Sequence, residues 1–326
     1  MSAARLAVRR FLGAAERDRS DAPLVVACSG GPDSLALAAA ARYVVRDAPV
    51  HGVVVDHGLQ EGSSEVAARA ARQLTDLGCD RAQVLTARVD GGGGLEAAAR
   101  RARYAALDRA RPEGSSVLLG HTLDDQAETV LLGLGRGSGA RSLAGMPAHD
   151  PPWGRPFLGL ERETTVAACR ALDLEPWQDP HNEDPRFTRV RLRTEVLPLL
   201  EDALQGGVAS ALARTAAQLR EDADALDLLA VEVRERAERR LDEEPGAGID
   251  VAELEPSPAA LRRRVLRDWL LSRGVPEVTD AHLRAADALV GDWRGQGGHR
   301  LPGSFVLRRA RGTLLVEAEG AKRPNG

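Results

Sequence analysis

Lysine is almost absent from this sequence of 326 residues, in which Lys322, close to the C-terminus, is the sole lysine. Mechanisms that use an enzyme lysine, such as Schiff-base formation or a Walker-A phosphate loop, are therefore nearly excluded. Aromatic residues make up only 3% of the chain, so a hydrophobic core must be built mainly from alanine, leucine and valine. The length suits one sizeable α/β domain and a smaller one.

Cysteine is also scarce, and Cys28, Cys79 and Cys169 form no Cys-x-x-Cys pair. This spacing offers neither a zinc site nor a disulfide framework, and it is typical of a reducing cytoplasm. No apolar run is long enough to span a membrane, and Glu16 and Asp18 argue against an N-terminal targeting signal. We therefore expect a cytoplasmic protein that has no membrane association.

The net charge of −4 argues against a generally basic surface for binding nucleic acid. Contacts with RNA would have to come from local arginine clusters. The C-terminal part contains two of them, formed by Arg262, Arg263, Arg264 and Arg267 and by Arg308, Arg309 and Arg311. Such clusters either contact phosphates or form solvated charged faces, and the sequence leaves both interpretations open.

The first half of the chain alternates short β-rich runs with helical stretches rich in alanine and leucine. Strands are expected at residues 24–27, 50–55, 83–87 and 117–119, with helices at 34–45, 64–77 and 95–109. This alternation predicts an α/β fold with a doubly wound parallel sheet and right-handed crossovers. Ligands should bind at the carboxyl ends of the strands.

Further along the chain, we expect a proline-rich irregular stretch at 147–156, a short helix at 164–172 and an Arg-rich helix that ends at Leu200. Residues 201–245 should form a long helical linker, since the charged helical pattern of 209–241 ends at Glu243-Glu244-Pro245-Gly246. Residues 246–326 should form a smaller α+β domain, with helices at 259–272 and 280–289 and strands at 303–309 and 312–317. The larger domain is then 1–200.

A glycine-rich turn follows the first expected strand, with the sequence Ser29-Gly30-Gly31-Pro32-Asp33-Ser34. Such a turn presents backbone N–H groups and a helix N-terminus to an anion. The two glycines permit close approach, Ser29 and Ser34 add hydroxyl donors, and Asp33 is placed to hold Mg²⁺ against phosphates. The alternative is a simple strand–helix turn capped by Ser34. The whole string favours a phosphate loop and resembles the pyrophosphate loop of ATP pyrophosphatases.

Polar residues also follow the other strands. Asp56 and His57 end the second strand, and His121 follows the fourth. Asp125 and Glu128 are three residues apart and project from one helix face, as a pocket for an ammonium group requires. Alternatively, Thr122 and Asp125 form a capping box that only stabilises the start of the helix.

Together these strings make a specific resemblance. SGGPDS, VDHGL, ARRARY, GHTLDDQAET and GRGSG, in that order, resemble the successive motifs of tRNA(Ile)-lysidine synthases. RPFL at 155–158 and the string from Trp177 to Pro198 continue the likeness, which covers about residues 20–200. Two positions depart from the family pattern: His181 stands where Ser or Thr is usual, and Val190 where Asn is expected.

The resemblance implies a fold of the adenine-nucleotide-binding, pyrophosphate-loop type and a reaction in two steps. ATP with Mg²⁺ would adenylate the C2 oxygen of the wobble cytidine in tRNA(Ile) with a CAU anticodon. Free L-lysine would then displace AMP. Arg103 would neutralise charge during adenyl transfer, Asp125 and Glu128 would orient the lysine, and one of Arg189, Arg191 and Arg193 would face the activated base or the substrate carboxylate. The general base and the oligomeric state stay open, and a homodimer is one of the allowed states.

The expected sites are as follows. The residues that carry the chemistry are Asp33, Arg103, Asp125, Glu128 and Arg189, with Asp33 also the metal ligand. The residues that bind ATP are Ser29, Gly30, Gly31, Pro32, Asp33, Ser34, Asp56, His57, His121, Arg136 and Gly137.

Other functions share parts of this pattern. A tRNA thiolase of the same superfamily should carry paired cysteines, which this chain lacks. An amide-forming synthetase would share the ATP loop but would need no tRNA. A non-catalytic tRNA-binding protein that retains ATP as a structural ligand would have no need for Arg103 and the two carboxylates.

Overall fold

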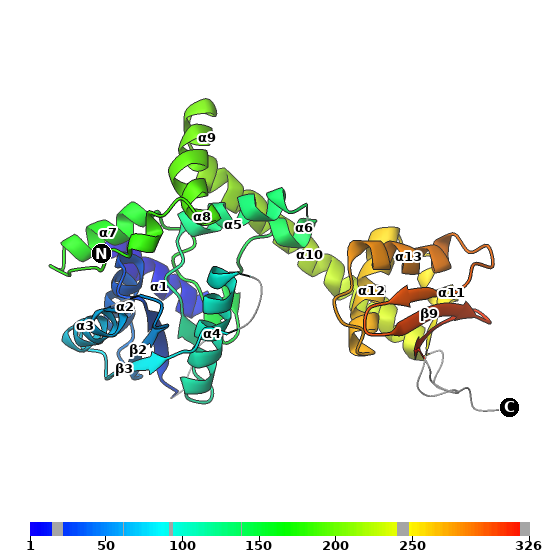
Figure 1. Cartoon of the computed structure of the whole chain (residues 1–326), viewed down its shortest axis with the longest axis horizontal. Helices are drawn as coiled ribbons and strands as arrows, with labels where there is room; N and C mark the ends of the chain where they lie inside the picture. Colours follow the sequence, from blue (N-terminus) through cyan, green and yellow to red (C-terminus); the bar gives the residue numbers. More distant parts are fainter. Residues whose placement is uncertain (15–21, 61, 91–93, 138, 240–247, 320–326) are drawn as a thin grey trace. The chain divides into compact units, whose positions relative to one another are not determined.

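The computed structural model describes residues 1–14, 22–60, 62–90, 94–137, 139–239 and 248–319 (Figure 1). Lys322 and the expected helix break at 243–246 lie outside these ranges. The chain divides into two compact units, Met1–Leu219 and Arg220–Gly326, and the boundary lies within the helix α10 (Val208–Arg239). In the described part of the chain, no helix is both long and apolar enough to cross a membrane.

The first unit contains a six-stranded sheet with the strand order β3-β2-β1-β4-β6-β5. The expected strands are confirmed as β1 (Leu24–Cys28), β2 (Val50–Asp56), β3 (Arg81–Thr86) and β4 (Val117–Leu118), and all of them are parallel. β1 lies in the centre, between β2 and β4. The loops that follow these three strands therefore lie close together at one edge of the sheet.

The prediction of an irregular stretch at 147–156 was wrong for two short segments. This stretch contains β6 (Trp153–Gly154), which pairs in parallel with β4, and β5 (His149–Asp150), which forms an antiparallel edge. Two-residue strands leave no alternating pattern in a sequence. Pro152 does not prevent pairing, because it contributes only its carbonyl oxygen, which accepts from the N–H of Val117 at 2.8 Å.

Helices cover both faces of the sheet, as a doubly wound fold requires. Leu24 and Val26 of β1 belong to one core cluster, and Val25 between them belongs to the other. The first cluster includes residues of α1 (Ser2–Ala14), α2 (Pro32–Val44), α3 (Ser63–Asp76) and α7 (Arg162–Arg170). The second includes Leu107 of α4 (Leu95–Ala110).

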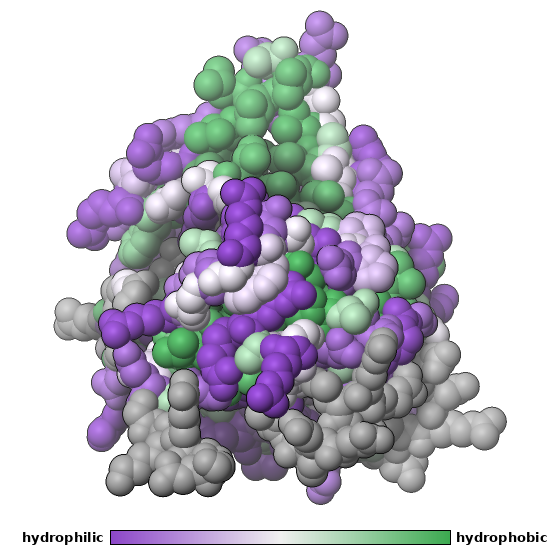
Figure 2. All heavy atoms as spheres, turned by 90° about the vertical axis from the view of Figure 1, so that its right-hand side faces the viewer, coloured by the Kyte–Doolittle hydropathy of each residue, from purple (hydrophilic) through white to green (hydrophobic). Residues whose placement is uncertain are grey.

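The remaining helices of this unit follow the carboxyl edge of the sheet. α5 (Leu123–Gly135) begins just after β4 and is followed by α6 (Ala140–Leu143). The expected Arg-rich helix is divided into α8 (Thr188–Arg191), a π-helical turn (Leu192–Val196) and α9 (Leu197–Ala203), after a short 3-10 turn at Pro180–Asn182. Figure 2 shows apolar side chains gathered over α9 at the top of the view, and Leu199 and Leu204 are among the exposed hydrophobic residues.

The second unit contains an antiparallel sheet with the order β7-β10-β9-β8. The expected helices and strands are confirmed as α12 (Ala259–Ser272), α13 (Asp280–Gly291), β9 (Phe305–Ala310) and β10 (Thr313–Ala318). β7 (Gly248–Asp250), β8 (His299–Leu301) and the short α11 (Val251–Leu254) were not predicted, because they are too short to show a period. Trp269, Ile249 and Leu270 lie fully buried between the sheet and the helices.

The first arginine cluster of this unit is used within the fold. Arg262 Nε lies 2.6 Å from Asp287 Oδ1, and the two side chains are only 15% and 12% exposed. Arg264 Nε lies 3.0 Å from Asp227 Oδ1. These two arginines therefore form neither a solvated face nor a phosphate-binding face. Their charges hold helices together.

This pairing predicts a loss of stability in Arg262→Gln, since the variant leaves the Asp287 carboxylate without its cation. We expect the free energy of unfolding to fall by roughly 1–3 kcal/mol, measured by urea denaturation of the whole chain. Arg263→Gln is the matched control, because Arg263 Nε donates to Ala259 O within its own helix. Equal midpoints for the two variants would contradict a structural role for the Arg262–Asp287 pair.

Candidate active site

The glycine-rich turn leads directly from β1 into α2. Gly30 has a φ of +83°, which favours glycine, and Gly31 is the N-cap residue of α2. The Ser34 hydroxyl accepts from Ser29 N at 3.1 Å and donates to Gly31 O at 3.0 Å. Ser34 therefore closes the loop on itself, and the N–H groups at the start of α2 are left to face an anion.

Two adjoining cavities lie beside this turn. The first, which we call the loop cavity, has a volume of about 470 Å³ and is lined by Ser29, Gly31, Pro32, Asp33 and Ser34 together with residues from the ends of β2 and β4. The second, which we call the arginine cavity, has a volume of about 380 Å³ and is lined by residues of α4, α5 and α8, among them Arg100, Glu128 and Arg189. Both cavities are lined by His57, Arg103, His121, Asp125, Asp179, Asn182 and Arg193.

Gly120 allows the end of β4 to reach the turn. A Cβ atom at this position would lie 3.0 Å from the backbone carbon of Asp33 and 3.1 Å from Ser34 N. Such contacts would be tighter than ordinary van der Waals contact, so glycine favours this close approach of two backbones. As a result, His121 and the start of α5 lie beside the glycine-rich turn.

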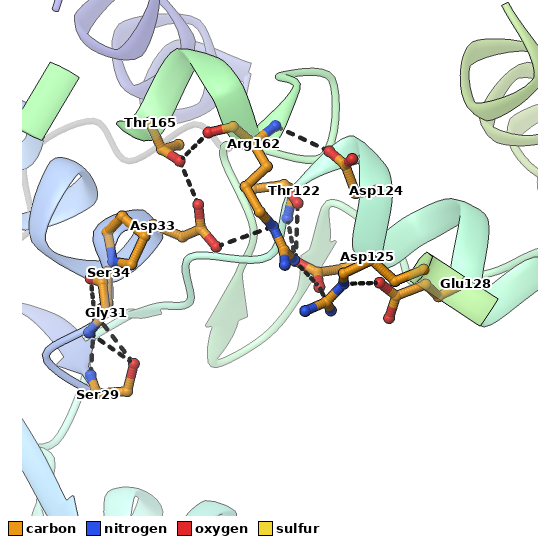
Figure 3. Close-up of polar contacts among 12 residues, drawn as sticks. Ser29, Gly31, Asp33, Ser34, Thr122, Asp124, Asp125, Glu128, Arg162 and Thr165 are labelled. Atoms are coloured by element: carbon orange, nitrogen blue, oxygen red, sulfur yellow. Dashed lines mark hydrogen bonds and ion pairs between the residues drawn. The ribbon is translucent and has the colours of Figure 1, made fainter. Parts of the chain in front are cut away.

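A network of carboxylates and arginines joins the two cavities (Figure 3). Arg162, at the start of α7, lies between Asp33 of the turn and Asp125 of α5, with Nε 3.7 Å from Asp33 Oδ2 and Nη2 2.8 Å from Asp125 Oδ1. The Thr165 hydroxyl donates to Asp33 Oδ1. Burial raises the pKa of Asp33, and Arg162 and the Thr165 hydrogen bond oppose this rise.

Asp125 has two roles at once. Its Oδ2 accepts from Thr122 N at 2.8 Å and from Thr122 Oγ1 at 3.0 Å, which completes the capping box of α5. Its Oδ1 faces Arg162 and also lies 3.6 Å from Arg193 Nη2. Burial would raise the pKa of Asp125, but Arg162 and the Thr122 N–H hold it below its ordinary value.

Glu128 is fully buried beneath two arginines. Its Oε1 accepts from Arg193 Nε at 2.7 Å, and its Oε2 lies 3.6 Å from Arg189 Nη1. Burial raises the pKa of Glu128, and Arg193 opposes this rise. Arg191 differs from its neighbours, since it is 61% exposed and pairs with Glu195. Arg189 and Arg193 are therefore the members of this arginine group that line the cavity.

Comparison with known families and proteins agrees with this geometry. Residues 5–200 match the PP-loop domain family, and residues 249–315 match the TilS substrate binding domain family. A tRNA(Ile)-lysidine synthase from Nocardia farcinica is 57% identical over 97% of this chain and 98% of its own length. One from Mycobacterium tuberculosis is 58% identical over 90% of each chain.

The chain belongs to the tRNA(Ile)-lysidine synthase family. It is thus an enzyme with an ATP-utilising PP-loop domain, and the resemblance in its motifs is confirmed. Among solved structures, a U34-tRNA thiolase from Methanococcus maripaludis has a TM-score of 0.53 and 17% identity, covering 68% of this chain and 79% of its own. At this identity the likeness shows the fold alone.

For a member of the lysidine synthase family, the buried polar atoms of the cavity walls are informative. Among the described residues, His57 Nδ1, His121 Nδ1 and Arg103 Nε are buried without a hydrogen-bond partner. Buried polar groups usually have partners, so these atoms are ready for a ligand. Burial and then the charge of Arg103 lower the pKa of His57, and burial lowers the pKa of His121 to about 3. His121 is therefore neutral near pH 7.

Three predicted residues of the lysidine synthase site lie elsewhere. Asp56 accepts from Gly58 N at 2.9 Å and lines a smaller cavity of about 130 Å³ beside His57. Arg136 and Gly137 are exposed at the C-terminal end of α5 and line neither main cavity. Their predicted contact with ATP stays a prediction.

Sequence reasoning missed Arg162 and Thr165. Neither belongs to a glycine-rich or carboxylate motif, and both lie about 130 residues from the turn that they contact. The only local signal is their place at the start of an expected short helix. Nothing in that signal indicates which carboxylates they meet.

The buried His121 gives a prediction about acid stability. As the pH falls below the ordinary histidine pKa of about 6.5, the unfolded chain takes up a proton at residue 121 that the folded chain does not. Between pH 7 and pH 5 this difference should lower the free energy of unfolding by about 2 kcal/mol. His121→Gln should therefore lose less stability between these pH values than the unsubstituted protein, as measured by denaturation at both.

The matched control is His149→Gln, since His149 is exposed. We expect this variant to keep the acid sensitivity of the parent. If His121→Gln showed the same loss of stability as the parent, a different group would be responsible.

Proposed function

We propose that this protein ligates free L-lysine to C2 of the wobble cytidine of tRNA(Ile) with a CAU anticodon. The reaction passes through an adenylated tRNA intermediate and gives lysidine, AMP and pyrophosphate. The observation that carries this proposal is the pair of adjoining cavities. A phosphate loop lines one of them, two carboxylates and several arginines line the other, and Arg103, His121 and Asp125 line both.

ATP fits the loop cavity. Its β- and γ-phosphates would take hydrogen bonds from the turn and the start of α2, where the helix dipole favours negative charge. Arg103 lies between the cavities and would neutralise charge at the α-phosphate as the C2 oxygen attacks. The buried Nδ1 atoms of His57 and His121 would gain partners from the bound nucleotide.

Magnesium fits the same cavity only together with ATP. In the described ranges, no three His, Cys, Asp or Glu residues are grouped to hold a metal ion. Mg²⁺ is commonly held by one or two carboxylates and by substrate phosphates, so a single carboxylate suffices. Asp33 would supply it, and the ion would neutralise phosphate charge. Asp33 would then exchange its contacts with Arg162 and Thr165 for the metal.

Lysine fits the arginine cavity. Its ammonium group would bind the carboxylates of Asp125 and Glu128, and an arginine released from them would pair with the lysine carboxylate. The reacting amine must lose a proton. Glu128, whose pKa is raised, is a better proton acceptor than Asp125, whose pKa is lowered.

The tRNA would contact both parts of the chain. We assign the chemistry to residues 1–200 and tRNA affinity to residues 246–326, and the segment between them contains the helix α10. The match of 249–315 to a substrate-binding family supports this assignment. An unpaired cytidine can be splayed into a pocket without opening a duplex. Since Arg262 and Arg264 are used within the fold, exposed residues such as Arg294 and Arg311 are better candidates for phosphate contacts.

A single assay separates this function from the alternatives. Pyrophosphate release from ATP should require both lysine and the cognate tRNA. Release with ammonia and a small acid, without tRNA, would indicate an amide-forming synthetase. A thiolase is disfavoured because burial raises the pKa of Cys79 and Cys169 to about 11, which leaves few thiolates.

The first variant to test is Asp33→Asn. Burial already favours the neutral form of Asp33, so the amide should preserve the fold while it removes the charge that holds Mg²⁺. We expect AMP formation to fall by about a hundredfold or more, with an unchanged melting temperature. Asp108→Asn is the control, because Asp108 is 55% exposed and pairs with Arg111. Full activity in Asp33→Asn would remove this residue from the metal site.

The second variant is Glu128→Gln. The variant loses one charge-assisted contact to the lysine ammonium and the proposed proton acceptor. The KM for lysine should therefore rise roughly ten- to a hundredfold and kcat should fall, with little change in the KM for ATP. Glu195→Gln is the matched control, because Glu195 also pairs with an arginine of the same segment but is 48% exposed. A normal lysine requirement in Glu128→Gln would mean that lysine binds elsewhere.

A further inference from the structure

Three residues with large, flat or apolar side chains form the rim of the arginine cavity. Leu59, His181 and Phe187 all line it, and none of them lines the loop cavity. We call this group the aromatic ledge. The rings of His181 and Phe187 lie 5.5 Å apart between centroids and are tilted by 58°.

The ledge is partly exposed. Only 3% of its residues are aromatic, and Phe157, for comparison, is fully buried. Leu59, by contrast, is 40% exposed, and so is the side chain of His181. Apolar and aromatic surface is therefore partly exposed at the arginine cavity.

Hydrogen bonds fix the His181 ring in place. The Gln60 side-chain amide donates to Asp179 Oδ1 at 3.0 Å and lies 2.7 Å from His181 Nδ1. The backbone N–H of His181 also donates to Asp179 Oδ1, at 2.9 Å. The ring is thus oriented before any ligand arrives, which lowers the entropic cost of stacking against it.

The charges around the ledge indicate what kind of ring it accepts. Arg100, Arg103 and Arg189 line the same cavity. Aromatic faces beside arginines are the usual arrangement for an unpaired nucleobase, whose ring stacks while its phosphates meet the cations. Leu59 and His181 also line the cavity of about 130 Å³ beside the glycine-rich turn, whereas Phe187 lines the arginine cavity.

We propose that the aromatic ledge stacks against the nucleobase next to the wobble cytidine on its 3′ side, which is the adenine of the CAU anticodon. This proposal rests on the proposed function, since it places the wobble cytidine in the arginine cavity. A purine offers a larger stacking face than a pyrimidine. Stacking its neighbour would hold the cytidine splayed out and aimed at Asp125 and Glu128.

The test uses an anticodon stem-loop in which 2-aminopurine, a fluorescent analogue, replaces this adenine. The complete protein should quench the fluorescence when it binds the stem-loop. His181→Ser removes the ring but keeps a polar group, and Phe187→Leu keeps the apolar volume but removes the aromatic face. Each variant should lose most of the quenching and bind the stem-loop roughly five- to a hundredfold more weakly, with unchanged affinity for ATP.

Tyr43→Leu is the control, because Tyr43 is 43% exposed on α2 but lines neither cavity. It should bind and quench like the parent. Parental quenching in both His181→Ser and Phe187→Leu would overturn the ledge, as would a parent protein that binds the stem-loop without quenching.

The fluorescence measurement needs only binding, so the two proposals can fail separately. A parent protein that quenches the probe through the ledge but does not ligate lysine would contradict the proposed chemistry and still support the stacking site. A parent that ligates lysine while both variants quench normally would support the chemistry and contradict the stacking site.

Discussion

The arrangement of the active site depends on the Arg162 guanidinium. It lies between Asp33, which belongs to the phosphate loop after β1, and Asp125, which belongs to the helix after β4. Two carboxylates that face one cavity would repel each other without a cation between them. The same residue donates its backbone N–H to Asp124 Oδ2 at 2.9 Å, so the start of α7 is attached to the start of α5. Arg162 thereby helps to set the distance between Asp33 and Asp125.

Under the proposed function, the substrates would replace internal ion pairs. In the structure, Arg162 pairs with Asp33, the carboxylate to which the proposed function assigns Mg²⁺. Arg193 pairs with Glu128, to which the proposed function assigns the lysine ammonium. The arginines already offset the free-energy cost of removing these carboxylates from water. An incoming cation therefore meets carboxylates that are already desolvated. Each arginine released in this exchange becomes available for an anion, either a phosphate or the lysine carboxylate. Cation and anion binding are thus linked through the same few side chains.

A feature could be predicted from the sequence when it depends on residues that are close together along the chain. The glycine-rich turn after β1, the four parallel strands and the placement of Asp125 and Glu128 on one helix are local patterns, and the structure has them as expected. β6 was missed because its pairing depends on β4 and not on its own two residues. The role of Arg162 and the pairing of Arg262 with Asp287 were not predicted, for a similar reason. An arginine reads the same in a sequence whether it meets solvent, a phosphate or a distant carboxylate.

The near absence of lysine has a chemical consequence for the proposed reaction. The positively charged side chains that line the arginine cavity are Arg100, Arg103, Arg189 and Arg193. A guanidinium stays protonated and is a poor nucleophile, whereas a desolvated lysine amine attacks activated carbon readily. An enzyme lysine at this place would compete with the substrate for the adenylated cytidine. In the proposed reaction, arginines supply the positive charge of this cavity, and free lysine would supply the primary amine that attacks the reacting carbon.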